Sequence, residues 1–139
     1  MNVYLDIDGV LLINETSLAN YADEFLQTIL EKYPDSTYWL MTQNLDDQKR
    51  AKVALVSLLK PKTITLLDKV KETKWEELKT EAINFDEDFI WFDDDLWPDE
   101  FKVLENKEAA EQFILVKLNE DPDTLKKLSE VVKANGQHL

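Results

Sequence analysis

Two groups of aspartates follow short apolar segments of this 139-residue sequence. The stretch Asp6-Ile7-Asp8-Gly9 comes after an apolar run near the N-terminus, and an acidic triplet at 93–95 comes after another run. Carboxylates that crowd together repel one another, so they either hold protons or bind a cation. Because Cys is absent and His138 is the one histidine, the available donors are oxygens, and hard oxygen ligands favour Mg²⁺.

A hydroxyl and an ammonium group complete the set of candidate side chains. Thr42 ends a further apolar run, and Lys74 stands at the predicted start of a helix over 75–82. These two groups could supply a hydrogen bond and a positive charge to a phosphoryl group. Asp6 could then act as a nucleophile, while Asp8 could protonate a leaving group and later activate water.

The elements that must position these side chains follow from the hydrophobic pattern. Short apolar runs with little alternation are typical of strands buried on both faces, and they occur at 3–7, 37–41, 63–67, 89–92 and 113–118. Apolar residues three or four apart predict helices between these runs, and they occur at 18–33, 51–59, 75–82 and 125–132. Pro61 is expected to end the second helix, and Asn135-Gly136 the last.

This alternation of strands and helices predicts an α/β fold. We expect a Rossmann-like three-layer sandwich, with a parallel sheet of about five strands and helices on both faces. No Gly/Ser-rich linker or internal repeat interrupts the pattern, so residues 1–139 are predicted to form a single domain. In such sheets the ligand crevice lies at the carboxyl ends of the strands, which is where the candidate side chains fall.

The order and spacing of these residues resemble the motifs of the haloacid dehalogenase-like (HAD) superfamily of Mg²⁺-dependent phosphohydrolases. The first motif of that family, an apolar strand followed by Asp-x-Asp-Gly, matches 3–10. The second, a strand that ends in Thr or Ser, matches 38–42, and the fourth, a strand that ends in paired acids, matches 89–94. The third motif is a lysine near the start of the helix before the fourth strand, and Lys74 matches it best.

The resemblance implies a role for each matched residue. Asp6 would form an aspartyl-phosphate and Asp8 would be the general acid and base. Thr42 and Lys74 would hold the phosphoryl oxygens. Mg²⁺ would bind the Asp6 side chain, the main-chain carbonyl of Asp8 and an acid of the fourth motif.

Some assignments within this resemblance stay open. Lys69 and Lys71 compete with Lys74, and Asp93 and Asp94 are favoured over Asp95 as metal ligands. Gly9, directly after the second aspartate, suits a turn with positive φ or a close approach of the backbone to phosphate. Receiver domains of two-component signalling also form an aspartyl-phosphate, but there the phosphorylated aspartate, the hydroxyl and the lysine lie on later strands.

The spacing of the motifs also predicts that the protein lacks a cap domain. In the HAD family, caps are inserted soon after the first motif or between the second and third. Here the first helical pattern begins near Ser17, and one helix and one short strand separate Thr42 from Lys74. Capless members of that family tend to act on large substrates or to use a neighbouring subunit as a lid.

Composition limits the partners. Against 16 Lys and Arg there are 29 Asp and Glu, so the net charge is −13, which disfavours nucleic acid and anionic membranes. No apolar run approaches the roughly 20 residues of a membrane helix. The N-terminus shows no secretory signal, so we expect a cytoplasmic protein. The expected partner is a phosphorylated small molecule or protein, and an oligomer is compatible with the sequence.

The sequence thus predicts a Mg²⁺-dependent phosphatase of the HAD type, a phosphoric monoester hydrolase whose substrate stays open. Its catalytic residues are Asp6, Asp8, Thr42 and Lys74, and Thr42, Lys74 and Gly9 contact the substrate.

Two alternatives remain beside the phosphatase hypothesis. One is a binding or regulatory protein that keeps the metal site but has little turnover. The other is an acidic interaction module, because residues 86–100 contain eight acids and no Lys or Arg.

Overall fold

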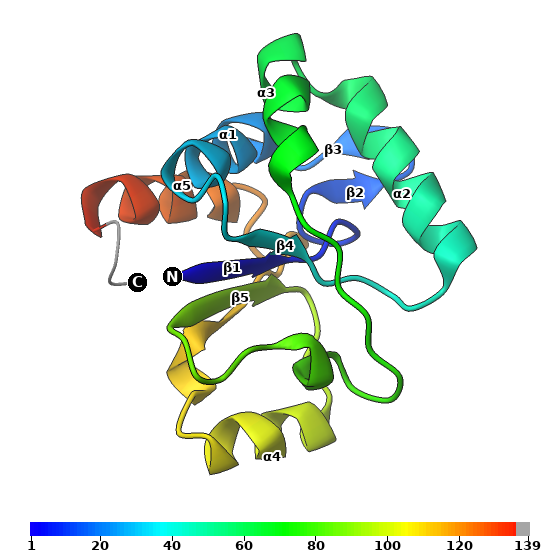
Figure 1. Cartoon of the computed structure of the whole chain (residues 1–139). Helices are drawn as coiled ribbons and strands as arrows, with labels where there is room; N and C mark the ends of the chain where they lie inside the picture. The colour runs from blue at the N-terminus through cyan, green and yellow to red at the C-terminus, as the bar shows by residue number, and fades with distance from the viewer. Residues whose placement is uncertain (136–139) are drawn as a thin grey trace.

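The computed structural model describes residues 1–135 and shows an α/β fold with a parallel four-stranded sheet (Figure 1). The strands are β1 (Asn2–Leu5), β4 (Thr37–Trp39), β5 (Phe89–Asp93) and β6 (Phe113–Leu115). Their order across the sheet is β4-β1-β5-β6. The predicted fold class and its parallel sheet are therefore confirmed, and β1 and β5 occupy the centre.

The two central strands are buried on both faces, as their unbroken apolar runs predict. All residues of β1 and β5 are buried, and Val3 pairs with Ile90 in the parallel register. Side chains alternate between the faces of a strand. Val3 and Leu5 therefore enter one hydrophobic core, while Tyr4 and Trp91 enter another on the opposite face.

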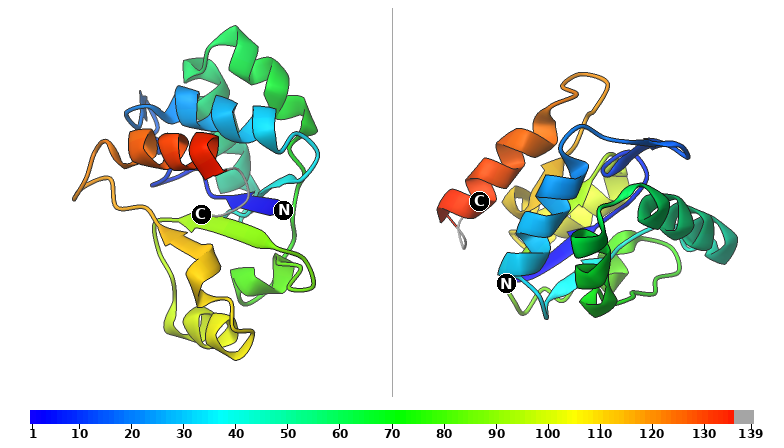
Figure 2. Two further views of the ribbon diagram at one scale, coloured as in Figure 1. Left: turned by 90° about the vertical axis from the view of Figure 1, so that its left-hand side faces the viewer. Right: turned by 90° about the horizontal axis from the view of Figure 1, so that it is seen from above.

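Helices cover both faces of the sheet (Figures 1 and 2). The larger core lies beneath helices that contribute buried apolar side chains to it, namely α1 (Ala22–Lys32), α2 (Leu45–Leu58) and α5 (Thr124–Asn135). The smaller core packs against α4 (Pro98–Asn106) and the single-turn 3₁₀ helices η2 (Lys79–Ala82) and η3 (Ala110–Gln112). The sheet is thus held between two apolar layers, and its carboxyl edge is left for polar residues.

A short antiparallel hairpin separates β1 from the first helix. It consists of β2 (Leu12–Asn14) and β3 (Ser17–Leu18). The predicted helix near Ser17 is therefore wrong at its start, because α1 begins only at Ala22. The Asn14 side chain closes the hairpin by accepting hydrogen bonds from the Thr16 backbone N–H and hydroxyl.

The predicted strand at 63–67 is wrong, because this segment forms α3 (Pro61–Leu66) and then η1 (Leu67–Lys69). Pro61 follows the end of α2, as predicted, but it also occupies the first turn of α3, where a missing N–H costs nothing. These helices take the place of the predicted fifth strand. Within residues 1–135, Lys71 alone pairs with the outer edge of β4, through a parallel bridge to Tyr38.

The predicted helix over 75–82 is also wrong. No α-helix forms between η1 and β5, and only the 3₁₀ turn η2 falls in that range. The Thr73 hydroxyl in this segment donates to the Trp39 carbonyl at 2.6 Å. Conversely, α4 was not predicted, and it starts at Pro98 within the acidic segment.

Two remaining observations concern the ends and the helices of the chain. Within residues 1–135, no helix combines the length and apolar character that crossing a membrane requires. Gly136 of the predicted helix stop and His138 lie outside the described residues.

Candidate functional site

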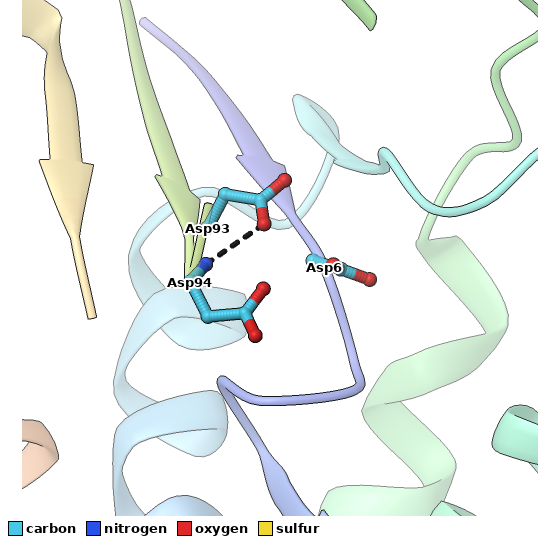
Figure 3. A group of neighbouring side chains, drawn as sticks. All are labelled: Asp6, Asp93 and Asp94. Atoms are coloured by element: carbon cyan, nitrogen blue, oxygen red, sulfur yellow. Dashed lines mark hydrogen bonds between the residues drawn. The ribbon is translucent and has the colours of Figure 1, made fainter. Parts of the chain in front are cut away.

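Three carboxylates gather at the carboxyl edge of the sheet. Asp6 directly follows β1, Asp93 ends β5 and Asp94 follows it. Because β1 and β5 are parallel neighbours, their carboxyl ends bring these side chains together (Figure 3). One carboxylate oxygen from each residue lies within 4.8 Å of the others. We call Asp6, Asp93 and Asp94 the acidic cluster.

A single lysine, Lys79, contacts the acidic cluster. Its ammonium group donates to Asp93 at 2.7 Å and to Asp6 at 3.3 Å. Lys79 is the first residue of η2, and its side chain is only 16% exposed. Asp94 has no ion pair with any cation of residues 1–135. The cluster therefore holds three carboxylates against one ammonium group.

Burial and mutual repulsion disturb the ionisation of this cluster. Burial raises the pKa of Asp6 above its usual range, against the attraction of Lys79. Burial and the neighbouring Asp6 raise the pKa of Asp93 to about 6. Burial and the adjacent Asp93 raise the pKa of Asp94 to about 6. Asp6 and Asp93 together raise the pKa of Lys79, so the lysine stays charged and the carboxylates compete for protons or a cation.

The loop after β1 is folded tightly around one carbonyl group. The Ile7 carbonyl accepts backbone hydrogen bonds from three successive residues, Val10, Leu11 and Leu12. Gly9 enters this loop with φ of 79°. A Cβ at Gly9 would lie 2.1 Å from the Asp94 carboxylate, so the glycine provides both the positive φ and the room that Asp94 needs.

Asp8 lies beside the acidic cluster but faces solvent. It is exposed and lines the same pocket as Asp6 and Asp94. Partial loss of hydration raises the pKa of Asp8, while the nearby Arg50 opposes the rise. A surface carboxyl with a raised pKa is suited to exchange protons with a bound molecule.

Thr42 also lines this pocket, although β4 ends at Trp39 and not at Met41 as the sequence predicted. It is half-buried, and its hydroxyl accepts a long hydrogen bond of 3.4 Å from the Asn44 N–H. The cap of α2 is Asn44, whose side chain accepts the Asp47 N–H at 3.0 Å. Thr42 is therefore not required as the helix cap.

The structure does not bring Lys74 to the acidic cluster. Lys74 is exposed and lines a neighbouring groove instead. Lys69 lies 4.0 Å from Asp35, and the Lys71 ammonium lies over the Tyr38 ring. Lys79 was not predicted as a site residue, because the motif lysine was expected at the start of an α-helix that does not form.

The pocket around the acidic cluster has a volume of about 450 Å³. Besides the cluster, Asp8, Thr42 and Lys79, its walls include Asp95, Trp97 and Glu100. Asp95 is exposed, and Trp97 is 51% exposed. Glu100 is only 3% exposed. The acidic segment 86–100 is therefore divided between buried site residues and surface residues.

A second groove of about 790 Å³ adjoins this pocket. The two share Gln43 and Trp75 as lining residues. The Trp75 indole donates to the Met41 carbonyl at 2.7 Å, which fixes the ring between the two spaces. A molecule bound at the acidic cluster therefore has room to extend beside Trp75.

The donor set of the acidic cluster fits a hard divalent cation. Its oxygen atoms are close enough to share one ion. The sequence contains no Cys, and residues 1–135 contain no His that could compete for the ion. Three carboxylates and one ammonium group leave a formal charge of −2, which a divalent ion would neutralise. Comparisons with protein-family models, curated proteins and solved structures found no match.

Proposed function

We propose that this chain is a Mg²⁺-dependent phosphohydrolase of the haloacid dehalogenase type, acting through an aspartyl-phosphate on Asp6. The observation that carries the proposal is the convergence of Asp6, Asp93 and Asp94 around Lys79 at the carboxyl edge of the sheet. The motif order noted in the sequence supports it. In this proposal the fold is a Rossmann-like three-layer sandwich without a cap domain.

Asp6, Asp93 and Asp94 would hold Mg²⁺ in this proposal. Bound Mg²⁺ would neutralise negative charge on the phosphoryl group and on the attacking carboxylate. Lys79 supplies the remaining positive charge, since it is fixed between Asp6 and Asp93. Charges that the fold holds in place in this way can stabilise a transition state without reorganisation.

The chain's own residues can then divide the reaction into two steps. An oxygen of Asp6 attacks phosphorus, and the leaving oxygen takes a proton from Asp8. Water then attacks the phosphorus of the aspartyl-phosphate, and Asp8 accepts the proton of that water. Partial loss of hydration raises the pKa of Asp8, which is the direction of change that a general acid requires.

The remaining polar groups would orient the phosphoryl oxygens. Thr42 lines the pocket and has a hydroxyl that can donate. The loop at Gly9 brings backbone close to the Asp94 carboxylate. Lys79 takes the phosphate-binding role that the sequence analysis gave to Lys74, because Lys79 is the lysine in contact with Asp6.

The substrate would be a phosphate monoester whose leaving group extends out of the pocket. The adjoining groove beside Trp75 can accept that group. The net charge of −13 disfavours polyanionic leaving groups, so a phosphorylated small molecule or protein remains the proposed substrate class.

The test is hydrolysis of an aryl phosphate with and without Mg²⁺, together with calorimetric Mg²⁺ binding. Turnover should require Mg²⁺ and disappear in Asp6→Asn. The matched control is Asp86→Asn, which removes an exposed acid that does not line the pocket. Binding of Mg²⁺ without turnover of aryl phosphates or phosphopeptides would favour a regulatory protein. Absence of Mg²⁺ binding would refute the proposed site.

A further inference from the structure

Lys79 lies in an unusually short helical turn. It is the first residue of η2, a four-residue 3₁₀ turn, and 3₁₀ hydrogen bonds have poorer geometry than those of an α-helix. The preceding residues 70–78 contain no helix. The position of Lys79 must therefore depend on contacts from outside the turn.

Glu100 provides such a contact from a different element. It is the third residue of α4, and it is only 3% exposed. One of its carboxylate oxygens accepts the Lys79 backbone N–H at 3.0 Å. The other accepts the Trp97 backbone N–H at 2.9 Å. Both oxygens are thus bound to main-chain donors, which offsets part of the cost of burying a carboxylate.

These two hydrogen bonds connect the two segments that form the acidic cluster and its lysine. Trp97 follows the acidic loop that carries Asp93 and Asp94, and Lys79 carries the ammonium group that contacts Asp93. One buried carboxylate therefore links the backbone of the lysine to the end of the acidic loop. A displacement of either segment would change how Lys79 reaches Asp6.

Glu81 makes a second set of contacts, but these are local. Its carboxylate accepts backbone N–H groups from three successive residues, Glu76, Glu77 and Leu78, at 2.8–3.1 Å. It therefore shapes the loop that leads into η2. Glu81 does not connect that loop to α4 or to the acidic loop, so the link between elements rests on Glu100.

We propose that Glu100 is a positioning residue. It holds the Lys79 backbone where the lysine ammonium group reaches both Asp6 and Asp93. The inference rests on the proposed phosphohydrolase function, since Lys79 is a catalytic residue only there. A displacement of about 1 Å in a catalytic group can lower turnover about 100-fold. A residue that acts through the position of Lys79 can therefore control the rate.

The chemistry of the contact requires a carboxylate. Glu100 offers one acceptor oxygen to each of two N–H donors. A glutamine at this position has one acceptor oxygen and an NH₂ group, which would face the second N–H donor. Glu100→Gln should therefore lose one of the two bonds while it preserves the volume of the side chain.

The experiment is a double-mutant cycle between Glu100→Gln and Lys79→Met, with aryl phosphate hydrolysis at saturating Mg²⁺ as the readout. Glu100→Gln alone should lower kcat/KM about 10- to 100-fold, mainly through kcat. In the Lys79→Met background it should cause no further loss, because it acts through that lysine. The matched control is Glu105→Gln, an exposed acid on the same helix. Equal losses in both backgrounds would overturn the inference.

Amide hydrogen exchange separates this inference from the proposed function. In Glu100→Gln, exchange should accelerate at the Lys79 and Trp97 amides, while the amides of the central strand β5 keep their protection. Unchanged exchange at both amides would overturn the inference even if the wild-type protein hydrolyses phosphate esters. Loss of protection throughout β5 would also overturn it, since Glu100 would then support the whole fold. Faster exchange at the two amides in a protein without turnover would support the positioning of Lys79 and refute only the phosphohydrolase.

Discussion

Asp94→Asn should stabilise the metal-free protein at neutral pH, although it removes a proposed metal ligand. The Asp94 carboxylate faces Asp6 and Asp93, while the Lys79 ammonium group contacts those two acids instead. Repulsion from Asp93 therefore adds to the desolvation of Asp94. Together they raise the pKa of Asp94 to about 6. Asn has nearly the same shape and removes the repelling charge.

The size of this stabilisation follows from the difference in the pKa of Asp94 between the folded and the unfolded protein. The pKa of Asp94 is 3.8 without the fold and about 6 within it, so the folded state binds more protons between these values. The free energy of unfolding therefore falls as pH rises from about 4 to 6, and it stays lower above that range. This difference in the pKa of Asp94 corresponds to about 3 kcal/mol. Because Asp94 is partly exposed, solvent screening reduces this to about 1–2 kcal/mol.

Thermal unfolding with a chelator present measures this effect. At pH 7.5, Asp94→Asn should raise Tm by about 3–8 °C, and at pH 4 or below the difference should disappear. The matched control is Asp95→Asn, which removes the same charge from an exposed neighbour and should change Tm little. Mg²⁺ at 100 times its Kd should stabilise the wild type by about 2.7 kcal/mol, whereas the variant should gain much less.

Two results would contradict the predicted effect of Asp94→Asn. The first is a lower Tm for Asp94→Asn than for the wild type at pH 7.5 without metal, since the carboxylate would then stabilise the fold. The second is an equal gain in Tm for Asp94→Asn and Asp95→Asn, which would indicate a general effect of net charge instead of a local one.

Three further predictions concern other parts of the structure. Lys79→Met should lower Mg²⁺-dependent kcat/KM by at least about 100-fold, and Lys74→Met should leave it near the wild-type value; the reverse order would contradict the geometry. Gly9→Ala should lower the free energy of unfolding by at least about 1–2 kcal/mol, because φ is 79° there, and urea unfolding measures it. Asp23→Ala should lower the free energy of unfolding by about 1–3 kcal/mol, since it removes hydrogen bonds between α1 and α3. Glu24→Ala, which changes an exposed residue, should lower it little in the same urea assay.

Within residues 1–135, the four strands of the parallel sheet and three of the five α-helices could be predicted, because the spacing of their apolar residues fits one type of element. The hairpin strands β2 and β3 were not predicted. β1 and β5 are unbroken apolar runs that end in aspartate, and both are buried throughout. The acidic cluster follows from these two strands alone, once they are parallel neighbours. The acidic cluster could therefore be predicted without knowing the structure of the segments between the two strands.

The segment 61–82 could not be predicted, because local signals there permit more than one structure. The run 63–67 is apolar enough for a strand, but the buried Asp23 side chain accepts hydrogen bonds from the Lys60 N–H and the Thr63 hydroxyl. These long-range contacts favour α3. The spacing of Trp75, Leu78 and Ala82 indicates a helix, yet Trp75 and Ala82 pack against the smaller core without an α-helix between them. Lys79 was missed for this reason.

The parallel pairing of β1 with β5 also determines how the chain must fold. Val3 and Ile90 are neighbours in the sheet but are separated by most of the sequence, and such non-local contacts slow folding. During synthesis β1 can pair first only with β4, and the apolar edge of β1 stays open until β5 emerges. Asp6 and Asp93 then come together in the same step that completes the sheet centre. Acquisition of Mg²⁺ affinity would therefore report, in time-resolved refolding, the moment at which that last central strand docks.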